Sequence, residues 1–251
     1  MEDKKFAFES EGEVSIAFTL VHGLGDMIVA KKVLTAVIEL APNCIVDIFG
    51  IAEHRKGAVK LLYSDIKNLN LTLLRDDSFK DIYQKYDLVF HVAGCWYVNI
   101  EYTNDQRLQK LSPSLFQAVT KIKAFNVENI QKAGFNRGAP VRFFAMAKVL
   151  NKSCYDILSC DGALPIRDNK VTIPLASEYQ SKFDDLKLGN YITIYSNIGI
   201  KETRPKNKTW PVRYFVEYVD LMKKHFPAVK IVQCGGGGIL RLQTPTVTSW
   251  A

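Results

Sequence analysis

An apolar run that ends in a glycine turn and leads into a long amphipathic segment constrains this chain more than any other stretch. Val14–Leu20 is the apolar run, His22–Asp26 (His-Gly-Leu-Gly-Asp) is the turn, and the amphipathic segment continues to Leu40. A strand, a glycine turn and a helix in that order build the ligand-binding crevice of α/β proteins at the carboxyl end of a strand. Glycines allow a sharp turn and a close approach to a bound group, and Asp26 is predicted to face the crevice from the first helical turn.

Strand and helix patterns alternate through the first half of the chain. The apolar runs typical of strands are 14–20, 44–49, 69–74 and 87–92. The segments with helical spacing are 26–40, 52–62 and 79–85. This alternation predicts a parallel sheet with helices on both faces. The less regular middle, 95–160, is interpreted as helices, at 113–125 and 140–150, that close the first domain.

A second α/β pattern follows a plausible boundary at 164–169, so we predict an N-terminal Rossmann-like domain over 1–168 and a second one over 169–251. An extended piece at 170–174 and a helix at 178–186 precede a strand at 191–195, a helix that starts at Pro211 and a strand at 230–234. The tail from Ile239 to Ala251 has no clear period. Because two parallel strands cannot cover their own faces, we expect the second domain to be incomplete.

Composition places the chain among soluble globular proteins. Of its 251 residues, 47% are apolar and 24% are charged. No apolar run reaches the roughly 18 residues of a membrane span, and Met1–Glu13 lacks the apolar core of a signal peptide. The prediction is a cytoplasmic protein, with peripheral contact with the inner membrane and oligomer formation left open.

Cysteine usage and net charge narrow the choice of ligand. Five cysteines without a CxxC pair and four histidines give no metal-site spacing, so no metal is predicted and buried free thiols are expected. A net charge of +7 favours an anionic partner. The candidates are a nucleotide, an acidic glycan, a membrane surface and nucleic acid. Nucleic acid is disfavoured, because the cations cluster in one loop and form no stripe along a helix.

The glycine turn itself supports two interpretations. In one, Asp26 only caps the helix, where the helix dipole favours an anion. In the other, it faces a ligand. A dinucleotide site would need a third glycine where Ile28 stands, so a nicotinamide site is disfavoured. An acid at this position suits a ligand hydroxyl better than a pyrophosphate.

The second candidate site is the polar segment Lys201–Arg213, which holds five cations and one acid. It is either a solvated basic loop or a phosphate clamp, and its place after a strand and before a helix favours the clamp. His22 and His91 are weaker candidates for polar crevice residues, and the Gly235–Gly238 run is a weaker candidate for a phosphate cradle.

With both segments located, the chain resembles glycosyltransferase family 9, the ADP-heptose:lipopolysaccharide heptosyltransferases. One matching segment is Gly23-Leu24-Gly25-Asp26, which resembles the family's Gly-Asp turn. The other is Lys208-Thr209-Trp210-Pro211 followed by Tyr214-Phe215, which resembles its Lys-x-Trp-Pro segment. The layout is similar over most of 14–235.

The resemblance implies a GT-B fold, with an N-terminal acceptor side and a C-terminal nucleotide-sugar side. It implies an inverting, metal-independent transferase that moves a sugar, such as heptose, from a nucleotide diphosphate to a bacterial surface glycan in lipopolysaccharide biosynthesis. Asp26 would be the general base and Lys208 would stabilise the leaving diphosphate. The residues that would contact the substrates are Gly23, Gly25, Ser196, Lys206 and Trp210.

No cofactor is implied, because the nucleotide sugar, ADP-heptose in the family, is a substrate. The family's later donor motif should lie beyond residue 240, where this chain reads Arg241–Pro245 and then stops at Ala251. The resemblance therefore predicts a truncated C-terminal domain. The alternative prediction is a non-catalytic module, derived from such a transferase, that binds a glycan or a nucleotide.

Overall fold

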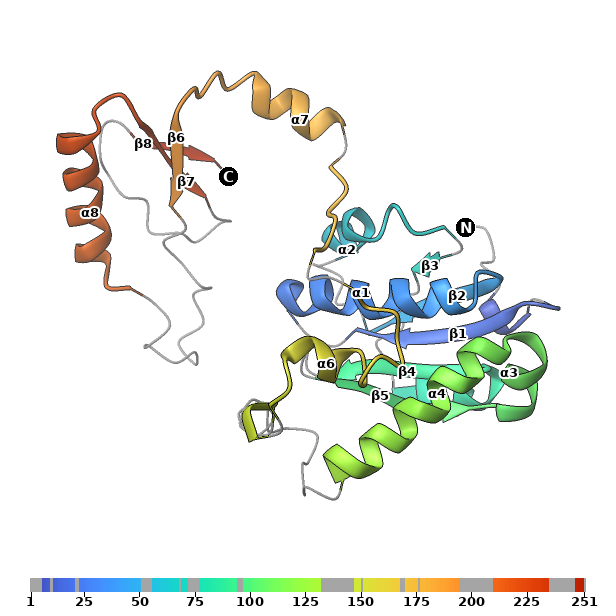
Figure 1. Cartoon of the computed structure of the whole chain (residues 1–251). Helices are drawn as coiled ribbons and strands as arrows, with labels where there is room; N and C mark the ends of the chain where they lie inside the picture. Colours follow the sequence, from blue (N-terminus) through green and yellow to red (C-terminus); the bar gives the residue numbers. More distant parts are fainter. Residues whose placement is uncertain are drawn as a thin grey trace. The chain divides into compact units, whose positions relative to one another are not determined.

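The computed structural model forms two compact units, Met1–Leu175 and Ala176–Ala251 (Figure 1). The domain boundary predicted from the sequence lies seven residues earlier, after residue 168. The structure describes the following residues: 6–9, 11–20, 23–50, 56–67, 69–71, 77–93, 97–131, 147–149, 151–167, 170–175, 177–194, 210–234 and 247–250.

A five-stranded sheet with the order β3-β2-β1-β4-β5 forms the centre of the first unit. Its strands are β1 (Val14–Thr19), β2 (Cys44–Phe49), β3 (Leu69–Leu71), β4 (Leu88–Ala93) and β5 (Tyr97–Thr103). The first four strands are parallel, as the alternating pattern predicted, and β5 pairs antiparallel with β4. The unit is therefore a mixed sheet with a parallel core.

Strand β5 is a correction, because the sequence analysis assigned residues 95–160 to helices and loops. The strand alternates apolar Val98 and Ile100 with polar Asn99 and Glu101, which is the period-2 pattern of a half-buried strand. An antiparallel strand can follow its neighbour directly without a crossover helix. The βα alternation that revealed the other strands therefore gave no signal for this one.

The helices of the first unit divide between the two faces of the sheet. Their bounds are η1 (Ala7–Glu9), α1 (Leu24–Leu40), α2 (Lys56–Leu62), η3 (Asp77–Lys85), α3 (Asp105–Leu111), α4 (Pro113–Asn126), η4 (Val127–Gln131) and α6 (Cys154–Leu158). The α-helices α1, α2, α4 and α6 pack with Phe18 and Phe90 in the larger core (Figure 1). The 3-10 helices η1 and η3 cover the other face, around Ala17 and Tyr86. A helix was predicted at 79–85, within η3, whereas no element was predicted at η1.

Two buried carboxylates connect the strands to their surroundings. Asp87, immediately before β4, accepts hydrogen bonds from the backbone N–H and the hydroxyl of Ser15 and from Nε of Arg107 on α3, at 2.9, 3.0 and 2.7 Å. Asp47, on β2, accepts from Ala7 N and from the Tyr86 hydroxyl, each at 2.7 Å. Burial and this carboxylate raise the pKa of Tyr86. Because buried charges cost free energy unless they are paired, these contacts connect β1 and α3 to the residue before β4, and connect η1 and Tyr86 to β2.

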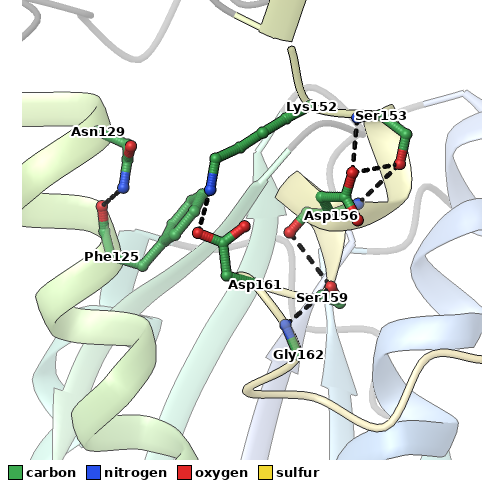
Figure 2. Close-up of polar contacts among 8 residues, drawn as sticks. All are labelled: Phe125, Asn129, Lys152, Ser153, Asp156, Ser159, Asp161 and Gly162. Carbon is green, nitrogen blue, oxygen red and sulfur yellow. Dashed lines mark hydrogen bonds and ion pairs between the residues drawn. The ribbon is translucent and has the colours of Figure 1, made fainter. Parts of the chain in front are cut away.

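Residues 151–164 pack against α4 through a polar cluster (Figure 2). The Lys152 ammonium pairs with the Asp161 carboxylate and lies 5.6 Å from the centre of the Phe125 ring on α4. Ser153 and Asp156 form a reciprocal cap at the start of α6, with the Asp156 amide donating to Ser153 Oγ and Ser153 N donating to Asp156 Oδ2. This cap lowers the pKa of Asp156, because its hydrogen bonds favour the charged carboxylate.

The second unit is a three-stranded parallel sheet with the order β6-β7-β8. Its elements are α7 (Ser177–Asp184), β6 (Tyr191–Ile194), α8 (Val212–His225), β7 (Lys230–Cys234) and β8 (Val247–Trp250). Val219 of α8 is fully buried between Ile194 and Ile231 of the sheet. Strand β8 is a correction, since the sequence analysis assigned no element to the tail from Ile239 onward.

Candidate functional site

The strand order of the first unit reverses between β1 and β4. From β1 the chain adds β2 and then β3 on one side, and it later places β4 on the other side. Ligands of open α/β sheets bind outside the carboxyl ends of the strands at such a reversal. Thr19 of β1 pairs with His91 of β4 at these ends, and the connection from β1 to α1 leaves from the same edge. The Gly23–Asp26 turn therefore lies at the topological switch point.

Asp26 is held in the first turn of α1. Its Oδ2 accepts a hydrogen bond of 3.0 Å from the backbone N–H of Gly23, the residue that precedes the helix. The side chain is half-buried, whereas Leu24 and Gly25 beside it are exposed, Leu24 at 46%. The carboxylate therefore caps the helix, which is the first of the two predicted roles. The second role, in which Asp26 faces a ligand, stays a prediction.

Tyr63, which was not among the predicted site residues, anchors this turn through a hydrogen bond to its backbone. The buried Tyr63 hydroxyl donates to the Met27 carbonyl at 2.8 Å, one residue beyond Asp26. Burial raises the pKa of Tyr63, so the phenol stays a neutral donor. Tyr63 directly follows α2, and no pattern in its own segment indicates a contact with α1. The hydrogen bond to Met27 depends on the packing of α2 against α1, which only the structure shows.

The structure corrects the expected role of the turn glycines. Gly23 has φ −69° and ψ 167°, which is extended backbone that any residue adopts, and a Cβ added to it would lie 3.6 Å from Asp26 Oδ2. Gly25 lies inside α1 with nothing within 4 Å of such a Cβ. The glycine that the backbone does require here is Gly50, after β2, with φ +79° and an added Cβ 2.9 Å from the Leu20 carbonyl oxygen. That a bound group approaches Gly23 and Gly25 closely stays a prediction.

His91 is paired with a carboxylate from the neighbouring strand. Its Nδ1 lies 3.1 Å from Glu101 Oε1 on β5, and Asn99 Nδ2 donates to the same oxygen at 2.6 Å. Both partners lie on β5, the strand that was not predicted. Asn99 and Glu101 alternate with apolar residues there, and this period-2 pattern is the sequence signal by which the strand could have been found. His91 is therefore part of a polar cluster at the carboxyl end of β4. His22 lies outside the described residues.

The second candidate site is described only from residue 210 onward. Lys208, Lys206 and Ser196 lie outside the described residues, as do Gly235–Gly238. Trp210 is 53% exposed and packs edge-on against Phe215, with their ring centres 5.2 Å apart. Tyr214 and Tyr218 lie near it, at 6.1 and 6.4 Å, and the Arg213 guanidinium lies 4.7 Å from the Tyr214 ring centre. An exposed aromatic platform thus forms at the start of α8.

The described residues contain no cluster of side chains that could form a metal centre. No three His, Cys, Asp or Glu side chains gather there as metal ligands. Cys44 and Cys160 are buried free thiols, as expected, and burial raises the pKa of each to about 12. No described helix is both long enough and apolar enough to cross a membrane.

Comparison with known proteins gave similar solved structures only. No family model matches the chain, and no curated protein matches it. The structure is similar to that of the glycosyl transferase family 9 from Veillonella parvula DSM 2008, with 17% identity and a TM-score of 0.48 over 93% of this chain and 68% of that chain. It is also similar to Escherichia coli heptosyltransferase WaaC with ADP, with 15% identity and a TM-score of 0.44 over 94% of this chain and 74% of that one. Similarity at this level describes a likeness of structure and decides neither reaction nor substrate.

Proposed function

We propose that this protein is a glycosyltransferase that moves a sugar, with heptose as the candidate, from a nucleotide diphosphate to a hydroxyl of a bacterial surface glycan. The observation that carries the proposal is the place of Asp26. Its carboxylate is oriented by Gly23 N at 3.0 Å, at an exposed turn on the switch point of the sheet. The two sequence segments that resemble family 9 glycosyltransferases support it, because one of them is this turn.

In the proposed reaction, Asp26 accepts the proton of the acceptor hydroxyl while that oxygen attacks the anomeric carbon of the donor sugar. The bond from that carbon to the diphosphate oxygen breaks on the opposite side, so the configuration inverts. Lys208 stabilises the negative charge that develops on the leaving diphosphate, and no metal ion takes part. A positioned general base contributes about 10²–10⁴-fold to such a step.

The residues of the second unit would bind the donor. Ser196 and Lys206 would contact the phosphates together with Lys208. Trp210 presents an exposed ring beside Tyr214 and Tyr218. Flat aromatic surfaces stack with bases and sugar rings, so this platform suits the nucleoside part of the donor. ADP-heptose is the first donor to test, and it would be a substrate and not a cofactor.

One observation favours a second candidate, a non-catalytic module that binds a glycan or nucleotide. The Asp26 carboxylate already accepts a hydrogen bond from Gly23 as a helix cap, which is a structural role that needs no substrate. A module of this kind would retain ligand binding and lack transfer.

The experiment that separates the two candidates measures binding and transfer on the full chain. Calorimetry with ADP and UDP should show saturable binding of at least one of them, and Lys208→Ala should weaken that binding and abolish transfer from the nucleotide sugar. Lys224→Ala, an exposed lysine in the last turn of α8, is the matched control and should change neither. Transfer that survives Lys208→Ala undiminished would contradict the assigned role, and nucleotide binding without any transfer would favour the module.

A further inference from the structure

Two side chains from the turn that follows α2 contact α1 close to Asp26. The buried Tyr63 hydroxyl donates to the Met27 carbonyl at 2.8 Å. The Asp65 carboxylate pairs with the Lys31 ammonium, whose Nζ lies 2.7 Å from Oδ1 and 2.9 Å from Oδ2. Met27 and Lys31 are four residues apart, so the two contacts lie on one side of α1, about one helical turn from each other. The first contact is one residue beyond Asp26.

The turn that carries these side chains, which we call the Tyr63–Asp65 turn, is closed by hydrogen bonds of its own. The Tyr63 amide donates to the Val59 carbonyl at 3.0 Å, and the Ile66 amide donates to the Tyr63 carbonyl at 3.0 Å. The Ser64 hydroxyl donates back to a carbonyl of α2 at 2.9 Å. Residues on such a continuous hydrogen-bonded element are positioned more accurately than residues on a loop. The turn therefore presents two rigidly related contacts to α1.

Burial makes the contact at Lys31 costly to break. The Lys31 side chain is 5% exposed, and its ammonium also donates to the Thr172 carbonyl at 2.8 Å. A buried ammonium that loses its partners leaves an uncompensated charge, which strongly destabilises a protein. Sliding of α1 along the Tyr63–Asp65 turn would separate Lys31 from Asp65. The ion pair therefore fixes α1 lengthwise, while the Tyr63 hydroxyl fixes its first turn.

The first turn of α1 needs an anchor of this kind if its carboxylate is to act on a substrate. Helix ends fray, and terminal turns open locally at little cost in free energy. Leu24, beside Asp26, is 46% exposed. The hydrogen bond from Gly23 holds the Asp26 carboxylate within the turn, but it does not hold the turn against the rest of the first unit. The Tyr63 hydroxyl supplies that second connection.

We propose that Tyr63 is a positioning residue for sugar transfer, and that it acts by holding the turn of α1 that carries Asp26. The inference rests on the proposed transferase function, in which Asp26 is the general base. A catalytic group has to stay within about 0.5 Å of its productive position, and a displacement of about 1 Å can lower the rate about 10²-fold. Asp65 supports Tyr63 from the same turn through its pair with Lys31.

The test compares Tyr63→Phe with Tyr86→Phe in the full chain. Each substitution removes one buried hydroxyl, and the control hydroxyl donates to Asp47 Oδ2 at 2.7 Å on the opposite face of the sheet. Both variants should lower the urea midpoint, because each loses a buried hydrogen bond. Only Tyr63→Phe should lower kcat, by about 3- to 10-fold, with KM unchanged. A displaced base weakens the transition state and leaves substrate binding intact.

Amide hydrogen exchange measures the restraint on the turn without any substrate. In Tyr63→Phe, peptides that cover residues 24–31 should exchange faster than in the unaltered chain, and in Tyr86→Phe they should not. Lys31→Met tests the second contact, because it replaces a buried ammonium with an apolar side chain and leaves Asp65, which is 41% exposed, in contact with water. It should also speed exchange in these peptides and lower kcat.

Three results would overturn the positioning role of Tyr63. They are an unchanged kcat in Tyr63→Phe, an equal loss of kcat in Tyr86→Phe, which would trace the effect to general stability, and unchanged exchange of residues 24–31 in Tyr63→Phe. Absence of transfer by the unaltered chain would instead contradict the proposed function. The exchange measurement needs no transfer reaction, so it still decides whether Tyr63 holds the turn, and the two failures remain distinguishable.

Discussion

The backbone N–H of Gly23 donates a 3.0 Å hydrogen bond to Asp26 Oδ2, so the residue before α1 fixes the carboxylate in its first turn. A side chain held in this way loses little rotational freedom when a substrate arrives, which is the condition for a well-positioned base. The same bond satisfies a backbone donor that the helix leaves without an intrahelical partner. One contact thus serves both stability and the proposed chemistry, and substitutions can separate the two.

Asp26→Asn should slow sugar transfer by about 10²–10⁴-fold, because the amide cannot accept a proton. Its side-chain oxygen can still accept the hydrogen bond from Gly23, so the free energy of unfolding should change by less than about 1 kcal/mol. Transfer rates and urea unfolding of the same preparations measure the two effects. Asp26→Ala, which also loses the cap, is the comparison for stability. An Asn variant that transfers sugar at the original rate would exclude Asp26 as the general base.

Gly25→Ala tests whether a bound group approaches the turn closely. Nothing lies within 4 Å of an added Cβ, and alanine is a better helix former than glycine by up to about 1 kcal/mol, so stability should be equal or higher. If the acceptor lies against this backbone, kcat/KM should fall about tenfold, the equivalent of one lost contact. Gly57→Ala in α2, which also has open space, is the control and should leave transfer unchanged. Unaltered kcat/KM in both variants would remove Gly25 from the site.

Gly50→Ala should destabilise the protein by about 2–4 kcal/mol, because it combines a left-handed backbone with a contact of 2.9 Å to the Leu20 carbonyl oxygen. Gly12→Ala measures the cost of the left-handed backbone alone, without a steric contact. Gly12 has the same φ of +79° and open space around its added Cβ, so about 1–2 kcal/mol is expected there. Urea unfolding of both variants gives the difference. Equal losses at the two positions would show that the Leu20 carbonyl does not restrict residue 50.

The buried thiols predict a loss of stability at alkaline pH. Burial raises the pKa of Cys44 and Cys160 to about 12, whereas an exposed thiol ionises near pH 8.5. The folded state therefore keeps protons that the unfolded chain releases, so the stabilisation is complete below about pH 8.5 and is lost progressively up to pH 12. The slope should approach about 1.4 kcal/mol per pH unit for each thiol above pH 9.

Urea unfolding between pH 7.5 and 9.5 measures this slope, in a range below the ionisation of the tyrosines. Cys160→Ala should reduce it, although the lost packing lowers stability at every pH. Peptide mapping after alkylation at pH 8 provides a second measurement, in which Cys44 and Cys160 should react only after denaturation. The half-buried Cys234 is the internal comparison. Rapid alkylation of Cys160 in the native protein would contradict its burial.

The sequence predicted some strands of the fold accurately and gave no indication of others. β1, β2 and β4 were found within one residue of their ends, because buried parallel strands are continuous apolar runs separated by helices. β5 was missed although its alternation was visible, since a strand that follows its neighbour without a helix breaks the βα rhythm. β8 was missed because its Val-Thr-Ser-Trp sequence carries no apolar run.

For the candidate site, the sequence by itself determined that an acid follows a glycine turn and that cations cluster before Trp210, which are the residues that we propose for the chemistry. Local chain order is sufficient for this, because strand, turn and helix follow one another within about twenty residues. Only the tertiary structure decided that Gly50, and not Gly23, requires glycine, that Tyr63 anchors Met27, and that Arg167 pairs with Glu39 of α1. Those contacts join residues up to 128 positions apart, and such separations are set by the packing of helices on the sheet, which no local pattern encodes.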